Sequence, residues 1–234
     1  MQTARSRLLA FASFLFLTLL AFSVYSQDLN IGFITGRGDD ALVEEAAWEL
    51  VGIEKTNLGA GDFGAANLST YDVIAIGVVA FDQNQDLKDN FEALKEYAEA
   101  GGYLLTIDFQ QDSTWIPDYF PHSLTLFDDD LDADGLSEVV DHPIWHIPNT
   151  ITDDHFAAAA WGAGDFMADG PQDAPGAWEP LLLAGPSSWP VMVGAEAGSG
   201  FVVFNSIQVL QSVGRAASEQ AIEVMENLLL GHVS

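Results

Sequence analysis

The sequence predicts a single α/β domain built on a mainly parallel sheet with helices on both faces. Two observations favour this fold class. Near-continuous apolar runs, Tyr71 to Val79 and Tyr103 to Phe109, are typical of strands covered on both faces. Segments with helical spacing alternate with these runs, and such a β-α-β order produces parallel strands joined by helical crossovers.

The chain begins this pattern after its first 27 residues. Residues 28–36 alternate between polar and apolar side chains and end in glycine, as a first strand does. Asp39 and Asp40 can cap a helix over residues 41–51. The apolar residues on one face of that helix are Leu42, Ala46 and Leu50. We expect a second strand over residues 53–58, followed by a glycine-rich loop.

A second helix is expected between the two long apolar runs. Apolar residues recur there at helical spacing until two glycines end the helix. The spaced residues are Leu87, Phe91, Leu94 and Ala98, and the glycines are Gly101 and Gly102. Residues 110–178 then form an irregular insertion that is rich in Asp, Pro, Trp and Gly.

The last third of the chain is regular again. Three strands are predicted, over residues 178–184, 190–195 and 200–207, with a hairpin turn at Gly198 to Gly200. An amphipathic helix from Ser218 to Leu230, with Gly231 as its C-cap, closes the chain.

Residues 1–26 have the features of a signal peptide. Arg5 and Arg7 precede an apolar run from Leu8 to Val24, and Val24-Tyr25-Ser26 resembles a cleavage site before Gln27. An uncleaved anchor is the alternative, because the apolar run is near the lower limit for spanning a bilayer. We therefore expect a mature single domain over residues 27–234 that is secreted or periplasmic and leaves the membrane after cleavage.

Composition excludes several classes of function. The 234 residues include 35 acidic and 7 basic side chains, for a formal net charge of −28, which argues against binding to nucleic acid or to anionic membranes. The chain contains no cysteine, so it has no disulfide, no cysteine-ligated metal and no thiol nucleophile. Apolar residues make up 49% of the chain, enough for one substantial core.

Several segments carry a family resemblance. The most specific is Asp141-His142-Pro143-Ile144 with Pro148-Asn149 and the threonine-rich turn that follows. Together with YDVIAIG, EYAEAGGYLLTIDF, WEPLLLAG and GSGFVVFNS, it resembles the class I glutamine-amidotransferase-like superfamily, in particular its trehalose-utilisation-type and secreted branch. The resemblance spans roughly residues 28–231 and implies a flavodoxin-like three-layer sandwich.

Active members of that superfamily carry a cysteine on a sharp strand-to-helix turn, with His and Glu completing a triad. This chain has no cysteine, and residues 109–113, where that turn would fall, contain no glycine. The resemblance therefore implies a domain without amidotransferase activity.

An acidic loop beginning at Asp130 is the sharpest local motif. Oxygen ligands at positions 1, 3 and 5, glycine at position 6 and a carboxylate at position 12 match an EF-hand-type calcium loop. The candidate ligands are Asp130, Asp132, Asp134, the Leu136 carbonyl, Glu138 and Asp141. A solvated acidic loop is the alternative, but closely spaced aspartates repel one another unless a cation is bound. We expect Ca²⁺ here and no organic cofactor.

Carboxylates and tryptophans offer a second candidate site. Asp108 ends a predicted strand at the sheet edge where open α/β sheets bind ligands. The candidate ligand-binding residues are Asp108, Trp115, Trp145 and Trp161, and Asp108 and His142 are the candidate catalytic residues. Tryptophan rings stack on sugar faces, but they also pack the irregular segments of a protein. Aspartates at strand ends, in turn, can cap the helices that follow them. We expect His142, which precedes a proline, to fix a turn.

Three hypotheses for function follow. The first is an exported non-catalytic amidotransferase-like domain that binds a glycan or an extracytoplasmic protein partner, with or without oligomerisation. The second is a carbohydrate-active enzyme that uses strand-end carboxylates. The third is a calcium-stabilised structural or assembly module.

Overall fold

The computed structural model describes residues 29–36, 40–78, 80–107, 118–124, 126–128, 137–156, 169–171, 177–184 and 189–232. The predicted signal peptide lies outside these residues. None of the helices in the described segments has the length and apolar character that crossing a membrane requires.

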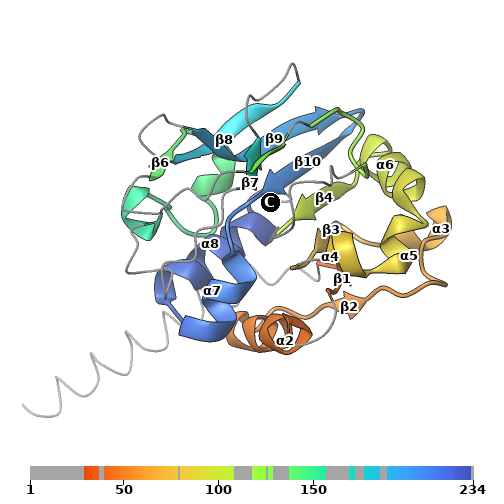
Figure 1. Cartoon of the computed structure of the whole chain (residues 1–234), viewed down its shortest axis with the longest axis horizontal. Coiled ribbons are helices and arrows are strands. Elements are labelled where there is room, and N and C mark those ends of the chain that lie inside the picture. Colours follow the sequence, from red (N-terminus) through yellow and green to blue (C-terminus); the bar gives the residue numbers. More distant parts are fainter. Residues whose placement is uncertain are drawn as a thin grey trace, which may run out of the picture.

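An eight-stranded sheet forms the centre of the described structure (Figure 1). Its strand order is β2-β1-β3-β4-β10-β9-β8-β6. The parallel strands are β1 (Ile31–Ile34), β2 (Thr56–Asn57), β3 (Val73–Ile76), β4 (Tyr103–Thr106) and β10 (Gly200–Asn205). The antiparallel strands are β9 (Trp189–Ala197), β8 (Glu179–Ala184) and β6 (Ser137–Val139). The α/β class and the β9–β10 hairpin at Gly198 are therefore confirmed, and the sheet is parallel in one half and antiparallel in the other.

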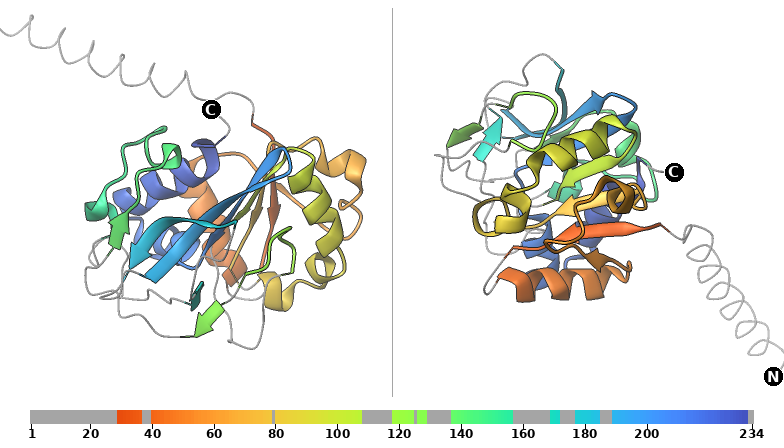
Figure 2. Two further views of the ribbon diagram at one scale, coloured as in Figure 1. Left: turned by 90° about the horizontal axis from the view of Figure 1, so that it is seen from above. Right: turned by 90° about the vertical axis from the view of Figure 1, so that its right-hand side faces the viewer.

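Helices cover both faces of the sheet (Figure 2). On one face lie α2 (Asp40–Val51), α7 (Val209–Ala216), α8 (Glu219–Leu230) and the 3-10 turns η1 (Pro143–Trp145) and η2 (Asp153–Phe156). On the other lie α3 (Ala65–Leu68), α4 (Ala80–Gln83), α5 (Gln85–Lys88) and α6 (Phe91–Glu99). A separate two-stranded ribbon pairs β5 (Leu126–Asp128) with β7 (Asp169–Pro171).

Alternation along the central strands creates two hydrophobic cores. In β3, Val73 and Ala75 pack against the α2–α7–α8 face, whereas Ile74 and Ile76 pack against the α6 face. Every residue of β1, β3, β4 and β10 is buried. This is why their sequences are continuous apolar runs and not alternating ones.

Helix α2 is rotated relative to the sequence prediction. The face with Leu42, Ala46 and Leu50 points outward, since Leu42 is 72% exposed and Leu50 is 46% exposed. The buried face carries Ala47 and Trp48, with Trp48 packed edge-on against Phe33 at 5.1 Å between ring centroids. The prediction was wrong because it chose the helix face with the two large leucines. The face that packs against the sheet carries Ala47 instead, whose small side chain allows a close approach.

Helix α8 fixes the segment after β6 against the sheet. The Asn227 side chain is fully buried; its Nδ2 donates to the Ile144 and Asn149 carbonyls, both at 2.9 Å, and its Oδ1 accepts from the Asn149 N–H at 3.0 Å. Gly231 follows, with φ of −69°, so glycine is not needed here to adopt the left-handed conformation that often ends a helix. A Cβ there would lie 2.8 Å from the Ile144 carbonyl oxygen, so glycine is needed for this close approach.

Two histidines enclose Phe201 at the amino end of the sheet. The His142 ring is stacked on Phe201 at 5.9 Å and 17°, and the His232 ring at 4.4 Å and 16°. Burial lowers the pKa of both imidazoles. Glu179 and Asp141 partly offset this effect on the pKa of His142, as Glu196 does on the pKa of His232.

These lowered pKa values predict a loss of stability on acidification. Because the unfolded chain binds protons at His142 and His232 more readily than the folded chain does, the free energy of unfolding falls as the pH decreases through about 6.5. Urea unfolding from about pH 7.5 to about pH 5.5 measures this slope. His142→Gln and His232→Gln should each reduce this slope. An unchanged slope in both stack variants would contradict the prediction.

Glu226 affects stability in the opposite direction at lower pH. Burial raises the pKa of its carboxyl group, so the folded chain binds that proton more readily than the unfolded chain does.

Candidate functional site

The carboxyl ends of β1 and β3 are where this topology favours a ligand. The chain leaves β1 for β2 on one side, and β3 lies on the other side of β1, so the connections diverge between β1 and β3. Open α/β sheets bind ligands in the crevice at such a switch point. The described residues at this point are Thr35 and Gly36 after β1, Gly77 after β3, and Glu44 from α2.

The Glu44 carboxylate lies at this switch point and is fully buried. It accepts a hydrogen bond from the Thr35 hydroxyl at 2.5 Å and one from the Gly36 N–H at 3.2 Å. A Cβ on Gly77 would collide with Glu44 Oε1. The carboxylate therefore occupies the space that a side chain at residue 77 would need, and glycine is required there.

Asn84 holds the same end of β1 from the other face of the sheet. Its Nδ2 donates to the Thr35 carbonyl at 3.0 Å, and its Oδ1 accepts from the Leu87 N–H at 3.1 Å. Asn84 therefore caps α5 and fixes the end of β1 at once. Around Thr35, the described groups bond to one another.

Sequence reasoning missed Glu44, although one signal was present. Glu44 precedes Ala47, Trp48 and Val51 by three, four and seven residues, which places all four on one helix face. A lone acid on a buried helix face requires bonding partners inside the protein, because an unpaired buried charge is costly. Finding it depended on choosing the correct face of α2.

Several predicted site residues lie outside the described residues. These are Asp108, Trp115, Trp161, Asp130, Asp132, Asp134 and Leu136. Glu138 lies in β6, and Asp141 is exposed, with its Oδ1 2.9 Å from His146 Nε2. Strand β5 precedes Asp130, and strand β6 lies within the predicted loop from Asp130 to Asp141, so neither of these described segments is a helix of an EF-hand. Within the described residues, no three His, Asp or Glu side chains are grouped so that they could hold a metal ion.

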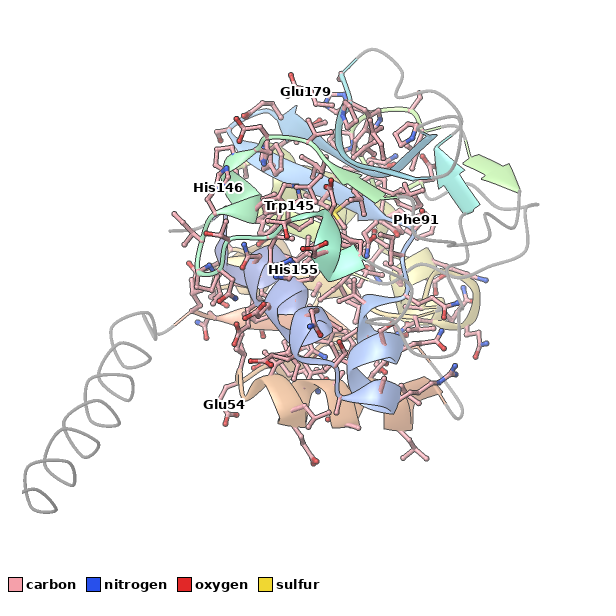
Figure 3. All side chains as sticks on the ribbon, turned by 90° about the vertical axis from the view of Figure 1, so that its left-hand side faces the viewer. Glu54, Phe91, Trp145, His146, His155 and Glu179 are labelled. Atoms are coloured by element: carbon pink, nitrogen blue, oxygen red, sulfur yellow. The ribbon has the colours of Figure 1, made fainter. Side chains whose placement is uncertain are left out.

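His142 and Trp145 both contribute to the structure of the η1 segment, in which Figure 3 labels Trp145. His142 caps η1, as expected, with Nδ1 accepting from the Ile144 N–H at 3.2 Å. Trp145 is fully buried, and its Nε1 donates to the Leu181 carbonyl at 2.9 Å. The Trp145 ring also packs edge-on against Phe156 at 5.8 Å. A fully buried ring has no face on which a sugar could stack.

His155 joins the segment after η1 to α8. Its Nε2 lies 3.0 Å from Glu223 Oε2, and its Nδ1 lies 3.0 Å from the Thr152 N–H nitrogen. His142, Trp145 and His155 thus come from the motif that carries the family resemblance, and all three act in packing or capping. Hydrogen bonds of Ile144, Asn149 and His155 hold this described segment against α8.

Comparisons with known proteins give a likeness of structure only. No family model matches the chain, and no curated protein matches it in sequence. A cytoplasmic protein from Salmonella typhimurium is similar with a TM-score of 0.50 and 17% identity, over 86% of this chain and 98% of that protein. A putative GMP synthase subunit from Thermoplasma acidophilum has a TM-score of 0.51 and 9% identity, over 86% and 92%.

An exo-β-1,4-mannosidase from an Opitutaceae bacterium is also similar, with a TM-score of 0.51 and 12% identity. The match covers 88% of this chain but 36% of the mannosidase. At such identities these likenesses show a shared α/β fold alone.

Proposed function

We propose that this protein is an exported, non-catalytic amidotransferase-like domain that binds a glycan or an extracytoplasmic protein partner. The order of its parallel strands, β2-β1-β3-β4-β10, supports the flavodoxin-like assignment, because it is the 2-1-3-4-5 order of that fold. The likeness to a putative GMP synthase subunit supports the family resemblance. The absence of cysteine removes the amidotransferase nucleophile.

The buried Glu44 carboxylate is the observation that carries the non-catalytic part of the proposal. It closes the base of the switch point with hydrogen bonds to Thr35 and Gly36, so its oxygens are engaged within the protein. A general acid or base has to reach its substrate. Glu44 is covered by its own helix and by the ends of β1 and β3, and it acts as a structural anchor for α2.

Exchange of Gly77 for alanine tests this structural role. The new Cβ would displace the Glu44 carboxylate and approach Phe33, so Gly77→Ala should lower the free energy of unfolding by about 3 kcal/mol. The matched control is Gly61→Ala, which has open space around its Cβ and should stay within about 0.5 kcal/mol of the parent. Urea denaturation measures both. Equal stability of the two variants would mean that Glu44 yields readily and that the switch point can open to a ligand.

Binding without turnover is the central expectation. The purified protein should release no ammonia from glutamine, and it should bind a component of a glycan array saturably. The variant Trp115→Ala/Trp161→Ala should lose at least tenfold in affinity, because stacking rings supply much of the contact with a sugar. Leu42→Ala, which removes an exposed apolar side chain from α2, is the control and should bind normally.

Three results would change this assignment. Ammonia release from glutamine would refute it. Cleavage of a bound glycan that Asp108→Asn abolishes would establish the carbohydrate-active enzyme instead. Failure to bind any glycan, with saturable binding of a protein, would assign the partner role.

We also propose that Ca²⁺ stabilises the acidic loop from Asp130 to Asp141, which includes β6. An ion that binds only the folded chain, at about one hundred times its Kd, adds about 2.7 kcal/mol, or roughly 5–10 °C in Tm. Calcium should therefore raise the Tm in a chelator-treated sample, whereas magnesium and sodium at equal ionic strength should not. Asp130→Asn/Asp132→Asn should remove the rise, and Glu49→Gln/Glu54→Gln, on and just after α2, should retain it. An equal rise with all three salts would show charge screening alone.

A further inference from the structure

A cavity of about 680 Å³ lies at the amino end of the parallel strands, opposite Glu44. It is formed by the end of α3, the end of α6, the starts of β3 and β4, and the turn after α8. Its volume is within the range of small-molecule sites. The residues that carry the argument are Tyr71, Asp72, Glu96, Tyr97, Tyr103 and His232.

Three of the chain's five tyrosines line this one cavity. Tyr97 and Tyr103 form a fixed wall, because both are nearly buried and both hydroxyls are bonded. The Tyr97 hydroxyl donates to the Tyr71 carbonyl at 3.2 Å, and the Tyr103 hydroxyl donates to the Leu228 carbonyl at 2.8 Å. Tyr71 is half-buried and His232 is exposed, so these two supply the accessible ring surface.

The glycines after α6 shape the same wall. A Cβ on Gly102 would run into the Tyr97 ring, so the ring lies directly on the backbone there. Gly101 has φ of +116°, a conformation that side-chain-bearing residues rarely adopt. The sequence pattern that ends the helix therefore also seats the Tyr97 ring and forms part of the cavity lining.

The charge around the cavity has one sign. Asp72 and Glu96 are both exposed, and the Asp72 carboxylate is held in place by the Asn30 N–H at 2.9 Å. None of the described lining residues is Lys or Arg. Helix α6 ends at Glu99, so its C-terminal carbonyls, the negative end of its dipole, lie at this side. The cavity therefore favours a positive ligand and disfavours an anion.

We infer that this cavity binds a small organic cation that carries a quaternary or alkylated ammonium group. Aromatic ring faces and carboxylates together are the groups that recognise such cations, since the rings offer π-electron density and the acids offer charge. A neutral ligand of the same shape would gain only the apolar contacts. This cavity is separate from the proposed glycan or protein site. The cavity lies at the amino ends of the parallel strands, whereas that site is predicted at their carboxyl ends.

Calorimetric titration of the full chain with choline tests the inference. The neutral isostere 3,3-dimethylbutan-1-ol, which replaces the charged nitrogen by carbon, is the matched ligand control. Choline should bind saturably with one site per chain, and the isostere should bind at least tenfold more weakly. Higher salt should weaken the binding of choline but not that of the isostere.

Variants separate a cavity site from general attraction to an acidic protein. Glu96→Gln and Tyr71→Leu should each weaken choline binding about fivefold or more, as should Asp72→Asn, whose amide oxygen can still accept from the Asn30 N–H. Glu54→Gln removes the same charge from an exposed residue beyond α2 and should have no effect (Figure 3). Because Glu96 is exposed, its variant tests the site even if a substitution at Asp72 impairs folding.

Three outcomes would overturn the inference. No saturable binding of choline would exclude the site. Equal affinity for choline and its isostere would show a purely apolar cavity. Equal losses in Glu96→Gln and Glu54→Gln would show that choline responds to the net charge of the protein and not to the cavity.

Discussion

The burial of β1, β3, β4 and β10 on both faces of the sheet is the constraint on which the rest of the structure depends. Every residue of β1, β3, β4 and β10 is buried, so each strand needs apolar partners above and below the sheet. Helices supply those partners, with α2, α7 and α8 on one face and α6 on the other. Since the faces are filled, the two ends of the strands are where the sheet can offer polar chemistry.

Those two ends have different characters. At the carboxyl end, Glu44, Thr35 and Asn84 bond to one another and to strand ends, so the described groups are satisfied internally. At the amino end, Tyr71 and His232 border an open cavity. Among the described residues, the carboxyl end that this topology commonly uses for ligands thus has the buried Glu44 carboxylate at its base, and the cavity lined by Tyr71 and His232 lies at the amino end.

Much of the fold could be predicted from the sequence, because strands buried on both faces leave a local signal. The runs at β3 and β4, the β9–β10 hairpin and helix α8 all appear as contiguous patterns, and Gly231 is the C-cap of α8 as expected. Helix α7 was missed, because it follows β10 after a short connection and was not separated from the end of the strand. The cavity could not have been predicted, since its lining combines residues near 70, near 100 and at 232, which only the tertiary structure brings together.

The contacts of helix α8 restrict the length of this helix. Three contacts lie close together at the end of this helix. Asn227 hydrogen-bonds to the η1 segment, and the Leu228 carbonyl accepts a hydrogen bond from the Tyr103 hydroxyl. The Gly231 backbone lies against the Ile144 carbonyl. His232 then reaches Phe201. Each residue added to a helix turns everything after it by about 100°. A single insertion or deletion in α8 before Asn227 would therefore misplace all four contacts together.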